Sequence, residues 1–202
     1  MSVTNRPILM LLPSLGRKSL GEAVNSLVHN GNGLADVIVI TGPGGFIGVV
    51  NDLPREFIAR YDIVGFMGDD GVMRTKDWDR IVWEKLKDKR GLIYGRDGHH
   101  DQRLCTHPFV STACLLALGF IQPPELHHYY GDNYYQELFT ALGRIEYVPE
   151  LFIEHLHPDT GKVPNDASYN LSREWWDRDS AAWSLYQRTR LPEDIARLRE
   201  IL

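Results

Sequence analysis

The sequence has 202 residues, 43% of them hydrophobic and 24% charged, which is typical of one globular domain with or without a tail. Its formal net charge of −5 gives no general attraction to nucleic acid, and only a local basic groove would supply one. No apolar run is long enough for a membrane span or a signal sequence, and the two cysteines, Cys105 and Cys114, lack metal-binding or CxxC spacing, so we expect a cytoplasmic protein without membrane contact.

The first half of the chain alternates between strand and helix patterns. Short continuous apolar runs predict three buried strands, at residues 7–12, 36–41 and 63–67. Apolar residues at helical spacing predict three helices, at residues 19–29, 54–61 and 78–89. Continuous apolar strands that alternate with helices indicate a mostly parallel central sheet flanked by helices on both faces. The predicted fold class is therefore α/β.

The second half of the chain is more polar. The patterns predict a strand at 91–94, a histidine-rich loop at 99–108, helices at 111–118 and 132–142, and a strand at 146–157 that Pro149 interrupts. From residue 172 onward the chain is polar and rich in tryptophan, and a last helix begins near Pro192. We therefore expect a body at residues 1–165 and a helical C-terminal extension at 166–202, packed on the body or on a partner subunit.

Two adjacent acidic residues, Asp69 and Asp70, follow the apolar strand predicted at 63–67. Neighbouring carboxylates repel each other, and a divalent cation relieves that repulsion. Carboxylate oxygens favour Mg²⁺ or Mn²⁺, and the C-terminal end of a strand is where α/β sheets bind ligands. A metal ion there could hold a diphosphate. The alternative is a simple Asp-Asp-Gly turn after a strand, which is a common structure.

A glycine-rich segment at residues 41–48 matches the TGxxGxIG pattern of short-chain dehydrogenases and sugar epimerases. Its glycines would let a pyrophosphate approach the backbone at a helix N-terminus, so an NAD-binding protein that uses the loop from Gly42 to Gly48 is one alternative. Three observations weigh against it: the loop follows the second strand, residues 49–54 form a poor helix, and the sequence has no Tyr-x-x-x-Lys pair.

Polar residues in three further places suit a binding cleft. Period-two alternation puts His155 and His157 on one face of a strand, where either could bind a metal, and puts Glu154 on the other face. Asp132 stands at the start of a predicted helix, where it could cap the helix, act as a general base, or do both. The loop at 13–17 follows the first strand, so its backbone could contact a nucleotide base and its arginine could reach a phosphate.

Taken in order, these segments resemble a family 2-like glycosyltransferase of the GT-A fold. The resemblance runs through residues 7–165, and it is particularly similar to compact bacterial and bacteriophage members with the pattern GDD…THP…D-N…EHxHP…GK. Here residues 106–108 supply the THP of that pattern, and 161–162 supply the GK. The segments that carry the resemblance are ILMLLPSLGR at 8–17, GFMGDD at 65–70, CLLALGF at 114–120, YYGDNYYQELFTALGR at 129–144 and EYVPELFIEHLHP at 146–158.

The resemblance implies a Rossmann-like GT-A fold and an enzyme that transfers a hexose or pentose from a nucleotide-diphosphate sugar to an acceptor hydroxyl with inversion. It implies that Asp70 binds Mn²⁺ or Mg²⁺, together with His157 or, as the second choice, His155. Asp132 corresponds to the catalytic base that takes the proton of the acceptor hydroxyl. The residues implied to bind the nucleotide sugar are Pro13, Ser14, Arg17, Asp69 and Asp97.

Some residues depart from the family pattern and affect these expectations. Gly68 replaces the first acid of a full DxD motif, which leaves the metal fewer acidic ligands. Residues 41–43 stand where many relatives carry an acidic residue that contacts the nucleotide base, so the identity of the nucleotide is left open. Gly131 replaces the first acid of the usual Glu-Asp pair, although the second acid, Asp132, is the one expected to act.

The sequence leaves the acceptor open. Protein hydroxyls, glycans and, in a phage setting, modified DNA bases are all compatible with it, although the negative net charge disfavours DNA. The expected compartment is accordingly the cytoplasm of a bacterium or of an infected host cell. We expect the segments at 99–108 and 125–135 to line the acceptor side, and the tryptophan-rich tail is compatible with a homodimer.

Two further classes of protein stay open at this point. One is a nucleotidyltransferase, which also uses acidic metal sites on α/β sheets, and the other is a non-catalytic protein on a degenerate GT-A scaffold. The presence of Asp70, Asp132 and His157 together weighs against a degenerate scaffold, because no single structural need requires all three.

Overall fold

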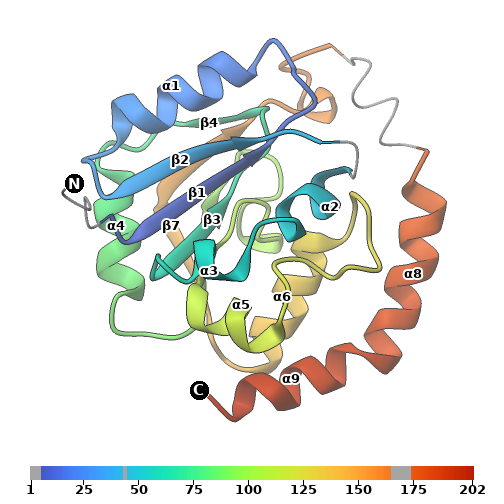
Figure 1. Ribbon diagram of the computed structural model, residues 1–202. Helices are drawn as coiled ribbons and strands as arrows, with labels where there is room; N and C mark the ends of the chain where they lie inside the picture. The colour runs from blue at the N-terminus through green and yellow to red at the C-terminus, as the bar shows by residue number, and fades with distance from the viewer. Residues whose placement is uncertain (1–5, 43–44, 165–173) are drawn as a thin grey trace.

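A computed structural model describes residues 6–42, 45–164 and 174–202 of the chain (Figure 1). The strands are β1 (Ile8–Pro13), β2 (Ala35–Ile40), β3 (Ile63–Phe66), β4 (Gly71–Met73), β5 (Leu92–Arg96), β6 (Phe109–Ser111) and β7 (Ile145–His155). The helices are α1 (Leu20–Asn30), α2 (Gly45–Asn51), α3 (Arg55–Ile58), α4 (Trp78–Leu86), α5 (Thr112–Leu118), α6 (Gly131–Ala141), α8 (Trp176–Thr189) and α9 (Leu191–Arg199). Short 3₁₀ helices follow β5, at Asp101–Arg103, and β7, at Pro158–Thr160.

One sheet of seven strands, in the order β2-β1-β3-β6-β5-β7-β4, forms the centre of the protein. β1 pairs in parallel with β2 and β3, which confirms the parallel sheet predicted for the first half of the chain. β6 runs antiparallel to both β3 and β5, and β4 runs antiparallel to β7. Because β5 and β7 pair in parallel, the second half of the sheet is mixed.

The two antiparallel strands that the sequence patterns missed are both short. β4 and β6 have three residues each, which is too few for strand periodicity to stand out from a turn. β6 also runs directly into α5, so its last residue falls inside the helix predicted at 111–118. Both strands matter for the site, because they connect the two halves of the sheet and place the acidic turn after β3 beside the end of β7.

β7 is one strand of 11 residues, but its pairing with β5 shifts in the middle. Gly95 pairs with Val148 and Arg96 pairs with Phe152, so the ladder skips the residues around Pro149, where the sequence predicted an interruption. A Cβ atom on Gly95 would lie 2.0 Å from the carbonyl oxygen of Leu151, so only glycine fits this close approach. Beyond the shift, the end of β7 pairs with β4.

Side chains alternate along the strands between two hydrophobic clusters, one on each face of the sheet. On β1, Ile8, Met10 and Leu12 pack with α1 and α4. Leu9 and Leu11 pack on the opposite face with α2, α5 and α6. This arrangement confirms the predicted α/β fold with helices on both faces.

The C-terminal helices lie along one side of the body, where α9 packs against α5 and α6 (Figure 1). Trp183 and Tyr186 of α8 are 5% and 2% exposed and contact the ring of Tyr134 in α6. The carboxyl group of Asp194 in α9 accepts hydrogen bonds from the hydroxyls of Tyr134 (3.1 Å) and Tyr186 (2.7 Å). The described part of the tail therefore packs on the body. The division at residue 165 remains a prediction, because 165–173 lie outside the described residues.

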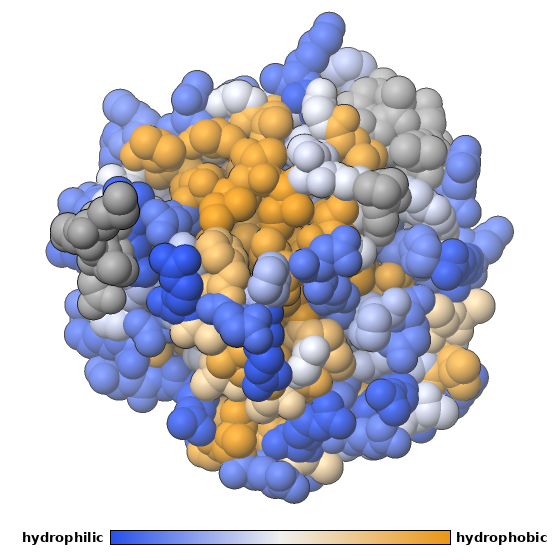
Figure 2. Space-filling view, viewed as in Figure 1, coloured by the Kyte–Doolittle hydropathy of each residue, from blue (hydrophilic) through white to orange (hydrophobic). Residues whose placement is uncertain are grey.

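Besides the single side chains of Leu15 and Val28, exposed hydrophobic side chains occur on two surfaces. One is the edge of the sheet formed by β2, where hydrophobic residues gather in the face seen in Figure 2 and Val39 is 38% exposed. The other is α8, where Trp176 and Leu185 are 50% and 57% exposed. None of the described helices is long and apolar enough to cross a membrane.

The hydrogen bonds to Asp194 should hold the tail on the body cooperatively. Tyr134→Phe and Tyr186→Phe should each lower the free energy of unfolding by about 1–2 kcal/mol, because a buried carboxyl group loses one partner. The double variant should lose more than the sum, since Asp194 then keeps neither hydroxyl. Urea unfolding would measure the free energy of unfolding of the two single variants and of the double variant. Tyr147→Phe is the control, because the contact of this side chain within the described residues is a ring contact with Tyr94 and not a hydrogen bond of its hydroxyl. Simple additivity would contradict the expectation.

Candidate active site

A cavity of about 920 Å³ opens at the C-terminal ends of β1 and β3. The loops that follow β1, β3, β5 and β7 line it, together with the first residues of α6 and α8. The predicted site residue Asp97 is 1% exposed and lies behind the wall. The cavity brings together the remaining predicted site residues, which are Pro13, Ser14, Arg17, Asp69, Asp70, Asp132, His155 and His157.

The acidic pair is held by the loop after β1. The Ser14 hydroxyl donates to Asp69 Oδ2 at 2.5 Å, and Arg17 Nη1 lies 2.6 Å from Asp70 Oδ2. Gly16, at a φ of 85°, lets the loop turn tightly enough for its own N–H to donate to the Ser14 oxygen. Burial raises the pKa of Asp69, and the Ser14 hydrogen bond and the Arg17 charge only partly offset this effect. Arg17 therefore supplies positive charge to both carboxylates.

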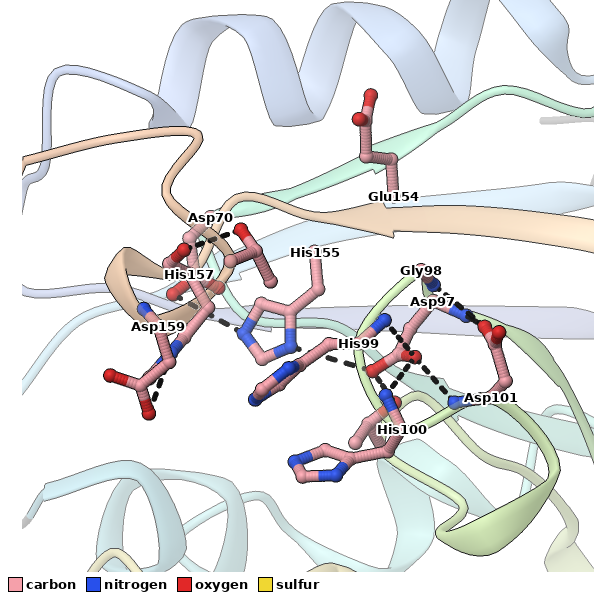
Figure 3. Close-up of polar contacts among 12 residues, drawn as sticks. Asp70, Asp97, Gly98, His99, His100, Asp101, Glu154, His155, His157 and Asp159 are labelled. Atoms are coloured by element: carbon pink, nitrogen blue, oxygen red, sulfur yellow. Dashed lines mark hydrogen bonds and ion pairs between the residues drawn. The ribbon is translucent and has the colours of Figure 1, made fainter.

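His155 lies between two carboxylates from different loops (Figure 3). Its Nε2 is 3.7 Å from Asp70 Oδ2, and its Nδ1 is 3.6 Å from Asp97 Oδ2, which are ion-pair distances rather than hydrogen bonds. Burial alone would lower the pKa of His155, but the two carboxylates raise it to about 9. The imidazole is therefore positively charged at neutral pH, with both nitrogens directed at acids.

Asp97 organises the loop after β5. Its Oδ1 accepts hydrogen bonds from the backbone N–H groups of His99 (2.9 Å), His100 (2.7 Å) and Asp101 (2.8 Å). Its Oδ2 accepts the hydroxyl of Thr106 at 2.9 Å. Although burial acts in the opposite direction, these hydrogen bonds and His155 hold the pKa of Asp97 well below its usual range. Both oxygens already have partners within the protein.

His157 has different neighbours from His155, although their rings lie 5.3 Å apart as period-two alternation predicted. The His157 ring stacks on His99, with centroids 5.2 Å apart and planes inclined by 13°. Its Nδ1 accepts the backbone N–H of Asp159 at 3.2 Å and lies 3.5 Å from the Asp159 carboxylate. In the described chain, His99, His157 and Asp159 form the one group of three that could hold a metal ion, with ligand atoms within 4.8 Å of one another.

Glu154 points away from this cluster, as predicted (Figure 3). Its carboxylate pairs with Arg74 at 2.7 Å and with Lys162 at 2.8 Å on the other face of the strand. The Gly-Lys motif at 161–162 thus contributes a structural ion pair here.

Asp132 lies at the cavity wall in the first turn of α6. The helix cap expected of it is not found: Tyr130 occupies the cap position with a φ of 69°, and Asp132 Oδ1 accepts the N–H of the next residue, Asn133, at 2.8 Å. The reason is that the helix begins one residue earlier than predicted. The protein packed around Asp132 raises its pKa, which brings this carboxylate closer to the range of a general base at neutral pH.

An aromatic wall, formed by Tyr129, Tyr130 and Trp176, closes the cavity beside Asp132. The Trp176 ring lies 4.9 Å from Tyr129 and 5.5 Å from Tyr130. Asp179 in α8 is fully buried and accepts the backbone N–H groups of residues 127–129 at 2.8–3.0 Å, which fixes this loop to the tail. Sequence reasoning missed the wall, because Trp176 comes from the tail and no motif connects it with Tyr129.

The charge of the cavity is strongly negative. Apart from histidines, the charged side chains among the described lining residues are one arginine, Arg17, and five aspartates: Asp69, Asp70, Asp132, Asp159 and Asp177. An anionic ligand would therefore need a cation to enter with it. Gly42 and Gly45 also line the cavity, but the loop on which the NAD alternative depends includes residues 43–44, which lie outside the described residues.

No protein-family model matches the sequence, and no curated protein matches it. Solved structures do match the fold. The mannosyltransferase PcManGT from Pyrobaculum calidifontis, in complex with GDP-Man and Mn²⁺, aligns with a TM-score of 0.64 at 11% identity, over 95% of this chain and 72% of its own. Glucosyl-3-phosphoglycerate synthase from Mycobacterium tuberculosis, in complex with Mn²⁺, UDP and phosphoglyceric acid, aligns with a TM-score of 0.53 at 17% identity, over 83% and 74%.

TarS from S. aureus aligns with a TM-score of 0.50 at 12% identity, over 72% of this chain and 59% of its own. These matches confirm the predicted fold: the chain has the GT-A fold of glycosyltransferases, with a mixed α/β sheet and a helical C-terminal region.

His107, a buried residue of the cavity wall, should make the folded state sensitive to acid. Burial, together with the charge of His155, lowers the pKa of His107 to about 4, whereas a histidine in an unfolded chain titrates near about 6.5. As the pH falls from 6.5 toward 4, the unfolded chain takes up this proton first, so stability is lost over that window, by about 2 kcal/mol at pH 5.

His107→Leu should remove that loss, which urea unfolding at pH 7.5 and pH 5 would measure. His29→Gln, on the exposed face of α1, is the matched control and should keep the wild-type difference between the two pH values. A leucine variant as acid-sensitive as the wild type would contradict the assignment of this effect to His107.

Proposed function

We propose that the protein is a metal-dependent inverting glycosyltransferase that moves a hexose or pentose from a nucleotide-diphosphate sugar to an acceptor hydroxyl. The observation that carries the proposal is the convergence of Asp69, Asp70 and Asp132 on one cavity at the C-terminal ends of parallel strands. Ligands bind at this end of α/β sheets. The fold shared with a mannosyltransferase bound to GDP-Man and Mn²⁺ supports the same function.

The donor diphosphate is the part of the substrate that the cavity is least able to bind without help. Arg17 is the one lysine or arginine among the described lining residues, and it already faces Asp69 and Asp70. On this proposal Arg17 binds a phosphate, and the loop at Pro13 and Ser14 contacts the nucleoside. Asp69, which Ser14 orients, binds the ribose or assists the metal.

The residues present fit a divalent metal ion held by the first-choice ligands, Asp70 and His157. Asp70 and His157 supply a carboxylate oxygen and an imidazole nitrogen, a mixed donor set that suits Mn²⁺ better than Mg²⁺. His155 fits less well, because both of its nitrogens face carboxylates. Bound at Asp70 and His157, the ion would act as a Lewis acid toward the leaving diphosphate.

His155 and Asp97 act on this proposal as positioning residues. The charged His155 holds the Asp70 side chain in place, and Asp97 holds His155 and the loop at 98–101. The direct contact between Asp97 and the donor sugar that the resemblance implied is not part of the proposal, because the Asp97 carboxylate is buried and already has its partners.

Asp132 is the proposed catalytic base. It takes the proton of the acceptor hydroxyl while the oxygen attacks the anomeric carbon on the side opposite the departing diphosphate, so the configuration inverts. A base with a raised pKa accepts that proton more readily than an ordinary carboxylate. The aromatic wall next to Asp132 offers flat apolar faces to an acceptor ring.

A glycan is the acceptor class that the cavity favours. Trp176 is half exposed and available for packing against a sugar ring beside Asp132. A DNA acceptor would need basic residues to balance its phosphates. Besides histidines, Arg17 is the one basic residue among the described residues that line the cavity. On this proposal it binds a phosphate of the donor, so none is left for DNA.

A thermal-shift screen would test the donor class. UDP-, GDP-, TDP- and CMP-sugars and NAD(H) are each added with and without Mn²⁺. One nucleotide-diphosphate sugar should raise the melting temperature only when the metal is present, by several degrees at about 100 times its Kd. Stabilisation by NAD(H) alone, with no response to any sugar nucleotide, would favour the dinucleotide-binding alternative and count against the transferase.

Asp132→Asn should separate catalysis from donor binding. We expect the variant to keep the metal-dependent thermal shift but to lose at least about 100-fold in sugar transfer to a glycan array, because an amide cannot accept the proton. Asp177→Asn removes a carboxylate from the same cavity and serves as the control. Transfer at the wild-type rate by the Asp132 variant would remove this residue from the mechanism.

A further inference from the structure

Two loops that are far apart in the sequence bring His99, His157 and Asp159 together (Figure 3). His99 belongs to the loop after β5, and the other two residues follow β7. One ligand atom from each residue lies within 4.8 Å of the others. Neither His99 nor Asp159 was predicted as a ligand, because nothing in the local sequence connects them with the acidic pair.

The chemistry of these three side chains is specific. Two imidazoles and one carboxylate suit a borderline cation such as Zn²⁺ or Co²⁺. Mn²⁺, a harder cation, binds such a set more weakly, and Mg²⁺ and Ca²⁺ prefer oxygen ligands. Ligands of one bound ion lie about 3–3.5 Å apart, so the group must contract slightly from its present spread. The Asp159 side chain is 68% exposed and can make that movement.

The protein holds both loops in the shape that presents these ligands. Three backbone N–H groups donate to Asp97, including that of His99 itself, and Gly98 takes a φ of 73° to allow the turn. On the other side, His157 anchors the short helix that carries Asp159, since its carbonyl accepts the backbone N–H of Thr160 at 3.0 Å. These hydrogen bonds fix the backbone of both loops, while the exposed Asp159 side chain keeps room to move.

Asp70 is in a different situation in the same structure. Its carboxylate lies 2.6 Å from Nη1 of Arg17, so a permanently charged guanidinium already compensates it. A metal ion that arrives alone would have to compete with Arg17 for Asp70. At the His99 group, no lysine or arginine of the described chain forms an ion pair with the Asp159 carboxylate, although the His155 ring lies 5.3 Å from that of His157 and 6.1 Å from that of His99.

We propose that His99, His157 and Asp159 form a transition-metal site that binds its ion in the absence of the sugar nucleotide. The role of that ion in transfer rests on the proposed function, but its binding does not. His157 is shared with the ligand pair proposed for the donor complex, so an ion loaded here lies beside the place where the diphosphate would bind. Metal binding then precedes donor binding.

The test is a calorimetric titration of the EDTA-treated full chain with Mn²⁺, Zn²⁺ or Mg²⁺ in the absence of nucleotide. Wild type should bind one equivalent of Mn²⁺ or Zn²⁺ and bind Mg²⁺ much more weakly. His99→Gln and Asp159→Asn should each weaken binding about tenfold or more, as loss of a ligand requires. Thermal unfolding without metal would verify that each variant is folded.

Matched controls come from the same cavity. His100→Gln alters a ring 4.0 Å from His99 that is outside the group, and Asp177→Asn removes another exposed carboxylate; both should bind metal within about twofold of wild type. Unchanged binding by His99→Gln would overturn the proposal, and so would absence of Mn²⁺ and Zn²⁺ binding by wild type. Because no donor is present, a failed donor screen would leave this result unaffected.

Discussion

The ion pairs of His155 with Asp70 and Asp97 connect three segments that are far apart in the chain: the turn after β3, the loop after β5 and the end of β7. Two backbone hydrogen bonds join the same segments. The N–H of His155 donates to the Asp97 carbonyl and the N–H of Leu156 donates to the Asp70 carbonyl, both at 2.9 Å. Without the imidazolium, both carboxylates would lose a cation that lies 3.6–3.7 Å away at a partly dry site, and the Coulomb attraction of one such pair is about 4 kcal/mol at 4 Å. The loops that surround the cavity therefore depend on one charged side chain.

Strand register is the reason that these groups meet. β4 pairs antiparallel with β7, and Gly71 lies opposite His155, so the acidic turn is directly beside the two histidines. The shift around Pro149 is what lets one strand pair first with β5 and then with β4. On the other side of the cavity, α6 presents Asp132 from a helix start that the tail supports through Tyr134 and Asp194. The helical tail thus contributes to the position of the proposed base, although it lies outside the segments that carry the family resemblance.

The parts of this arrangement that could be predicted from sequence are those encoded locally. The apolar runs at 8–12 and 63–67 and the acids after the second run are contiguous, so the strands and the acidic turn were predicted correctly. The alternation of side chains along a strand was enough to predict that His155 and His157 lie on one face of β7 and Glu154 on the other. Two of the neighbours that distinguish the two histidines, Asp97 and His99, come from a loop more than fifty residues away, and no local pattern encodes such a contact. The same holds for Trp176, which reaches the cavity from the tail.

The negative cavity also constrains the order in which its ligands can bind. Arg17 pairs with Asp70 in the present structure, so on the proposed mechanism a donor phosphate and the carboxylate compete for one guanidinium. If the phosphate takes Arg17, Asp70 loses a cation and becomes a better ligand for a metal ion at the moment when that ion is needed beside the diphosphate. The two events then favour each other, and thermodynamic linkage makes the effect reciprocal: the metal ion tightens donor binding by the same factor as the donor tightens the hold of Asp70 on the metal. A site with more basic residues would bind the nucleotide without metal and lose this dependence.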